Sequence, residues 1–244
     1  MKVYGLIGYP LSHSFSKGFF AEKFAREGIK GCMYDSFPIP EIGELPALLA
    51  QYPDLKGLNV TIPYKQAVMS YLDELSPAAA QIGAVNCIHF KDGRKIGYNT
   101  DAIGFRRSLE PLLQSHHNKA LILGTGGAAK AVQYVLESLN IPYKLVSRQA
   151  AADSISYEQL DASIIASHTL IINTTPLGMY PNVSAAPALP YEQLTDKHLL
   201  YDLIYNPAVT AFLQQGADRG ATIKNGHEML ILQAEASWEI WNNE

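Results

Sequence analysis

Short apolar segments alternate with segments of helical periodicity along almost the whole chain. This alternation is typical of βαβ units, in which helices connect parallel strands of one sheet. The sequence therefore predicts an α/β fold. In the first half we expect strands at residues 3–8, 34–38, 58–62, 85–90 and 96–98, the last two forming a hairpin, and helices at 15–27, 41–51, 64–75 and 103–113. After a polar linker at 114–119 we expect strands at 120–123, 143–147, 170–173 and 199–202, and helices at 128–139, 210–219 and 227–242.

The bulk composition limits the partners. The 244 residues are 48% hydrophobic and 17% charged, which suits one large or two small globular domains. The net charge of −4 provides no basic field for nucleic acid or an anionic membrane, and we expect neither as a partner. No run approaches the ~18 apolar residues that a membrane-spanning helix needs.

The cysteines and the N-terminus indicate the compartment. Cys32 and Cys87 lie far apart and form no CxxC pair, so we expect neither a disulfide framework nor a metal site. That usage suits a reducing cytoplasm. The apolar start of the chain is interrupted by Gly5, Gly8 and Pro10, which favours a buried first strand over a signal peptide.

A glycine turn follows the first strand of the second half. Gly124, Gly126 and Ala129 fit the pattern G-x-G-x-x-A between a strand and a helix. The first glycine permits a tight turn, the second lets the backbone approach a pyrophosphate, and the small third residue lets helix and strand pack closely. The helix N-terminus adds partial positive charge. We expect Gly124, Gly126, Gly127 and Ala128 to bind a dinucleotide; the alternative is a packing turn without a cofactor.

The end of the next strand distinguishes NADP from NAD. An NAD site carries an acid there, ~20 residues after the glycines, to hold the ribose 2′-hydroxyl. This chain has Ser147 and Arg148 instead, and no acid before Asp153. A serine hydroxyl and a guanidinium can both bind a 2′-phosphate, which favours NADP. The alternative for Arg148 is a solvated surface arginine.

Polar residues also follow the strands of the first half. The three serines 12, 14 and 16 stand where a strand turns into a helix, and by themselves favour helix capping over the binding of a small carboxylate. Pro63 predicts a helix start, which would place Lys65 in the first turn, where a cation opposes the helix dipole. Thr61 lies just before it at the strand end, where open parallel sheets bind ligands.

Two further strand ends add amides and a carboxylate. Asn86 follows one strand, and Asn99 and Asp101 follow another. Asp101 alone could be a helix N-cap. The joint occurrence of these groups in one half, with a cofactor motif in the other, favours an enzyme with a cleft between two domains.

Taken in order, these motifs match a known family. The chain resembles the shikimate dehydrogenases over essentially its whole length. Eight ordered motifs with similar spacing carry the resemblance, at residues 8–16, 59–65, 83–86, 99–104, 124–128, 173–179, 201–207 and 226–234.

The resemblance implies a reversible hydride transfer between NADP(H) and C3 of shikimate or 3-dehydroshikimate. It implies a substrate-binding and catalytic domain at 1–101, completed by the helix 227–244, and an NADP-binding Rossmann domain at 102–226. Lys65 and Asp101 would be the catalytic pair. Matching positions imply that Ser14, Ser16 and Tyr205 bind the substrate carboxylate, that Thr61, Lys65, Asn86, Asp101 and Gln233 surround the ring hydroxyls, and that Thr174, Met179, Ile204 and Gly226 belong to the cofactor site.

Three departures from the family pattern stand out. Lys17 replaces a usual proline, and Phe20 replaces a frequent histidine, but neither change removes a serine. The basic cluster after the second cofactor strand is reduced to Arg148, which weakens the preference for NADP. The alternatives are therefore a quinate/shikimate dehydrogenase that uses NAD, or a catalytically silent sensor of shikimate or NADP. The sequence allows a monomer or a homodimer.

Overall fold

The protein is described by a computed structural model that covers residues 1–11 and 14–243. Two compact units emerge from its internal contacts. Unit 1 holds Met1–Ile103 and the C-terminal residues from Gln233 onward, and unit 2 holds Gly104–Leu232. The chain changes unit inside two helices, α4 (Thr100–Leu109) and α8 (His227–Asn242). Ser12, named above with the capping serines, lies outside the described residues.

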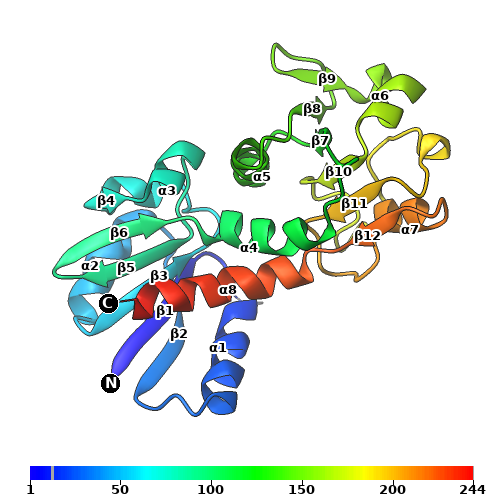
Figure 1. The fold of residues 1–244 in the computed structure, drawn as a ribbon. Helices are drawn as coiled ribbons and strands as arrows, with labels where there is room; N and C mark the ends of the chain where they lie inside the picture. The colour runs from blue at the N-terminus through cyan, green and yellow to red at the C-terminus, as the bar shows by residue number, and fades with distance from the viewer. Residues whose placement is uncertain (12–13, 244) are drawn as a thin grey trace. The chain divides into compact units, whose positions relative to one another are not determined.

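Unit 1 is built on a six-stranded mixed sheet with the order β2-β1-β3-β5-β6-β4 (Figure 1). The three strands that alternate with helices are parallel. The predicted hairpin of β5 and β6 is confirmed and antiparallel, with Asp92 and Gly93 at positive φ in its turn. The strands of this sheet are β1 (Lys2–Gly8), β2 (Cys32–Pro38), β3 (Leu55–Val60), β4 (Glu74–Leu75), β5 (Cys87–Lys91) and β6 (Arg94–Tyr98).

Helices α1 (Phe15–Arg26) and α8 supply the apolar side chains over one face of this sheet. Phe20 of α1 and Trp241 of α8 join Tyr4, Tyr34 and Cys87 in one buried cluster. Trp241 lies against the bare backbone of Gly57, where an added Cβ would come within 2.2 Å of the indole nitrogen. That nitrogen donates to the Ile88 carbonyl at 2.9 Å, so the last helix of the chain is fixed to the first domain's sheet.

Helices α2 (Leu45–Gln51) and α3 (Pro77–Ile82) were predicted only in part. The predicted helix 41–51 begins as a 3₁₀ turn, Ile42–Glu44, before α2, and α3 was not predicted. The predicted helix 64–75 is wrong. Residues 61–66 form turns, a 3₁₀ helix covers Ala67–Tyr71, and β4 follows. The Tyr64 amide donates to the Thr61 carbonyl at 2.9 Å, so Pro63 lies within a tight turn and does not begin a helix.

Unit 2 contains a six-stranded, all-parallel sheet with the order β12-β11-β10-β7-β8-β9. The strand order reverses between β7 and β10, which is the topology of a doubly wound Rossmann fold, as predicted. Helices α5 (Gly127–Ser138), α6 (Ala162–Ser167) and α7 (Ala211–Ala217) connect its strands. The strands are β7 (Ala120–Leu123), β8 (Tyr143–Ser147), β9 (Ser154–Ser156), β10 (Leu170–Asn173), β11 (Leu199–Asp202) and β12 (Thr222–Lys224).

The four longer strands of unit 2 match the predicted ranges, whereas β9, β12 and α6 were not predicted. β9 and β12 are three-residue edge strands, too short for a periodic pattern to indicate them. The predicted helix 103–113 starts earlier, as α4, and ends in the 3₁₀ turn Glu110–Leu112.

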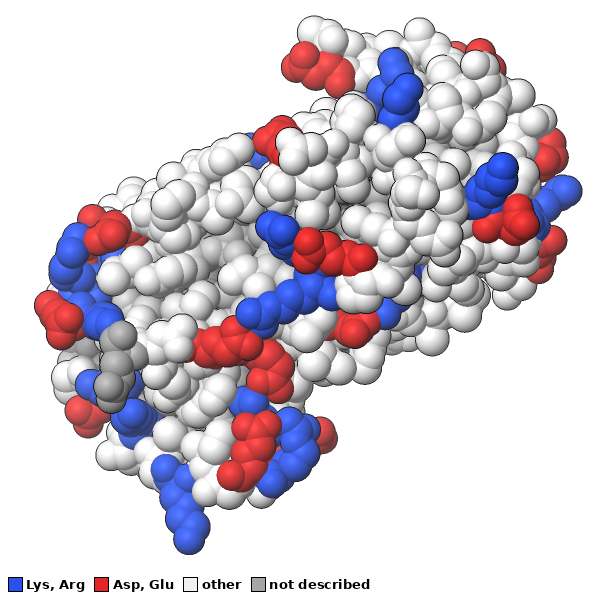
Figure 2. Space-filling model, viewed as in Figure 1, with Lys and Arg blue, Asp and Glu red and all other residues white. Residues whose placement is uncertain are grey.

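Charges of both signs are interspersed on the face of the molecule shown in Figure 2. The face carries no extended basic area among the residues described there, in keeping with the net charge of −4. Among the described helices, none is both long and apolar enough to span a membrane.

Candidate active site

Lys65 and Asp101 form an ion pair in unit 1. The Lys65 Nζ atom donates to Asp101 Oδ2 at 2.7 Å. Their side chains are 34% and 22% exposed, so both are partly desolvated and still reachable from solvent. An ammonium has three protons, and a carboxylate has two acceptor oxygens. The pair can therefore present a donor and an acceptor to one small polar ligand while remaining bonded to each other.

A turn, not a helix, carries Lys65. The Tyr64 amide donates to the Thr61 carbonyl at 2.9 Å, which closes the turn after β3. The Lys65 carbonyl accepts from the Val85 amide at 2.7 Å, which ties the turn to the segment before β5. The expectation that Lys65 opposes a helix dipole in a first turn is thus wrong, because the helix is absent there.

The start of α4 orients Asp101. Asn99 caps this helix, since its Oδ1 accepts from the Ala102 amide at 3.0 Å. Asp101 lies in the first turn, where helix geometry stabilises a negative charge. The alternative of Asp101 as the N-cap is therefore excluded.

Asn86 fixes the same helix start. Its Oδ1 accepts from the Thr100 amide at 2.6 Å, and its Nδ2 donates to Thr100 Oγ1 at 2.9 Å. Both groups are almost fully buried. Asn86 thereby fixes the residue next to Asp101, while one Nδ2 hydrogen remains for a further acceptor.

A buried polar network lies beside these residues. Asn59 Nδ2 donates to Ser237 Oγ at 2.8 Å, and Ser237 lies 3.2 Å from Thr100 Oγ1. The Tyr34 hydroxyl donates to Asn59 Oδ1 at 2.9 Å, and burial raises the pKa of that hydroxyl. The network connects β2, β3, α4 and α8. It thereby makes the structure that supports the Lys65–Asp101 pair rigid.

The serines at the start of α1 have different surroundings. Ser14 occupies the N-cap position, yet its side chain makes no capping hydrogen bond. Its Oγ atom is buried and has no hydrogen-bond partner among the described residues. Ser16 lies in the first turn of α1 and is partly buried. The capping interpretation is thus wrong for Ser14, and its unpartnered hydroxyl is free to bind a ligand.

In unit 2 the glycine turn leaves room for a cofactor. Gly124 has φ +105°, and an added Cβ would lie 2.8 Å from Thr174 Oγ1. Around Gly126 and Gly127 nothing lies within 4 Å of an added Cβ, and Gly126 is the N-cap of α5. Ala129 is fully buried, as the close packing of helix and strand requires. This arrangement fits the pyrophosphate of a dinucleotide.

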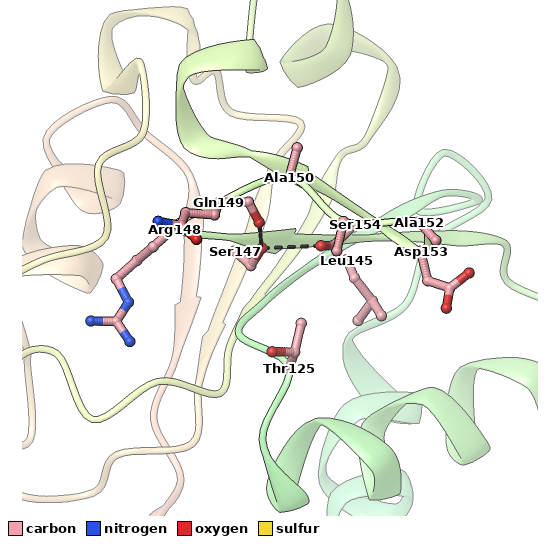
Figure 3. A pocket seen from close by; sticks show the side chains of 10 residues that line it. Thr125, Leu145, Ser147, Arg148, Gln149, Ala150, Ala152, Asp153 and Ser154 are labelled. Carbon is pink, nitrogen blue, oxygen red and sulfur yellow. Dashed lines mark hydrogen bonds between the residues drawn. The ribbon is translucent and has the colours of Figure 1, made fainter.

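Two pockets extend from this turn. One of about 360 Å³ is lined by the glycine turn, Arg148 and residues 174–177. The other, of about 920 Å³, is lined by Thr125, Leu145 and residues 147–154 (Figure 3). Ser147 Oγ donates to the Gln149 carbonyl and lies 3.0 Å from Ser154 Oγ, so it holds its own loop. Arg148 points away from Asp153 in Figure 3 and is the only cation in either lining, within the described part of the chain.

The loops after β10 and β11 follow the carboxyl ends of two parallel strands, so both lie at the same edge of the sheet. Thr174 Oγ1 donates to the Leu123 carbonyl at 2.7 Å. The Gly226 amide donates to the Ile204 carbonyl at 3.0 Å, and a Cβ on Gly226 would lie 2.1 Å from the Leu203 oxygen. Met179 and Tyr205 are 49% and 43% exposed. These two side chains are therefore available to a ligand.

Comparison with known proteins identifies the family. Residues 6–88 match the model of the shikimate dehydrogenase substrate binding domain. The chain is 37% identical over 258 residues to the NADP-dependent shikimate dehydrogenase of Methanosphaera stadtmanae, with 97% of this chain and 90% of the relative aligned. This chain belongs to the shikimate dehydrogenase family.

Solved structures of family members have the same fold. The Thermus thermophilus shikimate 5-dehydrogenase in complex with NADP(H) and shikimate is 29% identical, with a TM-score of 0.86 over 99% of this chain and 94% of that one. The Listeria monocytogenes enzyme in complex with shikimate and NAD is 28% identical, with a TM-score of 0.88 over 100% and 92%.

Within this family fold, the predicted site residues fall into two groups. Unit 1 holds Ser14, Ser16, Thr61, Lys65, Asn86, Asp101 and Gln233, while unit 2 holds Tyr205 and every predicted cofactor residue. Gln233 is buried one helical turn from Ser237, whose hydroxyl donates to its carbonyl. Sequence reasoning missed Tyr34, Thr100 and Ser237. The spacing of Gln233 and Ser237 by four residues, on one face of an apolar helix, could have indicated the last of these.

Proposed function

We propose that this chain is an NADP-dependent shikimate dehydrogenase that interconverts 3-dehydroshikimate and shikimate, a step of aromatic amino-acid (chorismate) biosynthesis. The partly exposed Lys65–Asp101 pair carries the proposal, because a carbonyl reduction needs one proton donor beside the reacting oxygen. Full-length similarity to NADP-dependent shikimate dehydrogenases supports the choice of substrate.

We assign substrate binding and catalysis to unit 1 and NADP binding to unit 2. NADP suits the open backbone at Gly126 and Gly127, the N-terminus of α5 and the cation of Arg148. When bound, the nicotinamide supplies or accepts the hydride at C3 of the substrate. We assign the surroundings of the nicotinamide to Met179, Ile204 and Gly226. We assign contacts with the rest of NADP to Gly124, Gly126, Gly127, Ala128, Ser147, Arg148 and Thr174.

The protein's own part is to orient the ring and move one proton. In reduction the Lys65 ammonium donates a proton to the substrate oxygen, which becomes the hydroxyl. In oxidation the hydroxyl proton leaves to the Lys65–Asp101 pair, which we treat as one acid–base unit. Asn86, through its remaining Nδ2 hydrogen, binds a ring hydroxyl, as do Thr61 and Gln233.

The substrate carboxylate is assigned to hydroxyl groups. Ser14 offers a buried hydroxyl without a partner among the described residues, which is costly unless a ligand uses it. Ser16 lies two residues on, and Tyr205 exposes its phenol in unit 2. Hydroxyl donors can hold a carboxylate without an arginine.

NAD-dependent oxidation of quinate is the second candidate. The cofactor pockets contain one cation, Arg148, and one acid, Asp153, among their lining residues, and Ser147 is already bonded within its loop. A weakly charged site of this kind discriminates little against a cofactor without the 2′-phosphate.

A spectrophotometric assay that crosses shikimate and quinate with NADP and NAD tests both candidates. The proposal predicts the highest kcat/KM for shikimate with NADP. Preference for quinate with NAD would support the second candidate. Shikimate binding without turnover in any of the four combinations would instead indicate a sensor.

The compartment and assembly are also proposals. Cys32 and Cys87 are free thiols, and burial raises the pKa of Cys87 to about 12, so the second is a poor nucleophile. Free thiols suit the reducing cytoplasm, where we place the enzyme. A monomer or a homodimer is expected, and light scattering at assay concentration distinguishes them.

A further inference from the structure

Unit 2 buries a carboxylate that the mechanism above does not use. Asp202, the last residue of β11, has no exposed surface. It accepts from Thr210 Oγ1 at 2.6 Å, from Asn173 Nδ2 at 3.0 Å and from the Ile204 amide at 3.1 Å. All three donors are neutral. A buried carboxylate among neutral donors is expensive to desolvate, so stability alone does not explain it.

One series of hydrogen bonds leads from Asp202 through Asn173 to the cofactor pocket. Asn173 Oδ1 accepts from the amide and the hydroxyl of Thr175, at 3.0 and 2.6 Å. Thr175 Oγ1 accepts in turn from the Leu177 amide at 3.3 Å. Residues 174–177 form one wall of the pocket of about 360 Å³ that also contains the glycine turn. Asp202 thus fixes the position of this wall of the pocket through its hydrogen bond with Asn173.

A second series of hydrogen bonds leads from Asp202 into the loop after β11. Asp202 bonds to the Ile204 amide, and the Ile204 carbonyl accepts from Gly226. Thr210, which donates to Asp202, also caps α7 by accepting from the Leu213 amide. Both ends of residues 204–210 are therefore held by one carboxylate, while Tyr205 and Val209 within that loop remain exposed.

We propose that Asp202 is a positioning residue for the reaction, which holds the loops 173–177 and 204–210 of the cofactor site in a fixed relation. The carboxylate touches neither cofactor nor substrate and acts through Asn173, Ile204 and Thr210. Asn173 and Ile204 donate to Oδ1 and Thr210 donates to Oδ2, so Asp202→Asn replaces one of the two accepting oxygens by a donor and breaks the link between the two loops. This inference rests on the proposed function for the identity of the cofactor.

The test compares the whole cofactor with its adenosine half. For Asp202→Asn we expect the Kd for NADPH to rise and kcat to fall by about tenfold or more, because small misplacements of positioning groups are costly in rate. Adenosine 2′,5′-bisphosphate uses the pocket of Arg148 and residues 174–177 but lacks the nicotinamide that we assign to Ile204, so its Kd should rise clearly less than the Kd for NADPH. Asp161→Asn is the matched control, since Asp161 caps α6 in the same unit at 2.8 Å from the Ile164 amide.

Two results would overturn the proposal. A lower melting temperature with unchanged NADPH affinity and kcat would make Asp202 purely structural. Equal weakening of NADPH and of the bisphosphate would indicate general damage to unit 2. If Asp202→Asn does not fold, Thr210→Val removes one donor and Thr210→Ser keeps it, so only the valine variant should reproduce the effect. Both Kd values are measured without turnover, so they stay readable even if wild type fails to oxidise shikimate.

Discussion

In unit 1 the proposed catalytic side chains are held by other side chains, whereas the glycine turn of unit 2 is shaped by backbone. Asn86 bonds to Thr100 beside Asp101, and Asn59 and Ser237 join the same network. Gly124, Gly126 and Gly127 instead provide a turn, a helix N-terminus and open space. The two regions are therefore sensitive to different substitutions: around Lys65 and Asp101 a changed functional group matters, and at the glycine turn of unit 2 an added methyl group matters.

The largest effect should come from Lys65→Ala. We expect kcat to fall by two or more orders of magnitude, about the contribution of a general acid–base group, with little change in shikimate binding. Lys95→Ala is the control, because Lys95 forms a comparable ion pair with Asp73 in the same unit at 2.9 Å. Steady-state kinetics and shikimate titration of both variants provide the measurement. Turnover within a few-fold of wild type would remove Lys65 from the mechanism.

The second effect concerns the substrate carboxylate. Ser14→Ala and the double variant Ser14→Ala/Ser16→Ala should raise the KM for shikimate by roughly tenfold or more, since a hydrogen bond to a charged group is worth ~1.5–3 kcal/mol. NADPH binding should not change.

Ser76→Ala separates binding from capping. Ser76 is a true N-cap of α3, whose side chain accepts from the Ala79 amide at 3.2 Å. Losing it should cost about 1 kcal/mol of folding stability and leave the KM unchanged. If Ser14→Ala also lowers the melting temperature and leaves the KM normal, the serine contributes to stability only and does not bind the carboxylate.

The third effect tests the backbone-built site. Gly126→Ala adds a methyl group where nothing lies within 4 Å, so the melting temperature should not fall. The same methyl group obstructs the approach of a pyrophosphate, and we expect NADPH affinity to drop by about tenfold, or ~1.4 kcal/mol. Gly18→Ala, in open space on α1, is the control. Unchanged NADPH affinity would show that the cofactor does not bind at this turn.

The smallest effect concerns the recognition of the 2′-phosphate of NADP by Arg148. Arg148 is exposed, so its contact with a 2′-phosphate should be worth about 1 kcal/mol. Arg148→Ala should therefore raise the KM for NADP by roughly fivefold and leave the KM for NAD unchanged. Equal changes for both cofactors would show that Arg148 does not recognise the phosphate.

The sequence predicted unit 2 better than the site of unit 1. The strands around Gly124 and the parallel order follow from local apolar runs and a glycine spacing, which are short-range signals. The turn at Lys65 was predicted as a helix because Pro63 is compatible with either a helix start or a tight turn, and only the surrounding structure selects between them.

The periodicity of the sequence did not predict the polar contacts between residues that are far apart in the chain. Lys65 and Asp101 are 36 residues apart, and Asn59 and Ser237 are 178 apart. Periodicity carries no information on which distant polar groups meet. The role of the Lys65–Asp101 pair was therefore proposed through resemblance to a family, and the supporting network was not predicted at all.

The central claim is that Lys65 and Asp101 act as one acid–base unit, and a double-mutant cycle on kcat tests it most directly. Lys65→Ala, Asp101→Asn and the double variant are measured with shikimate and NADP. Residues that act together are strongly non-additive, so the double variant should be only a few-fold slower than the worse single variant. Multiplicative losses would contradict the account, because they would mean that the two side chains contribute independently.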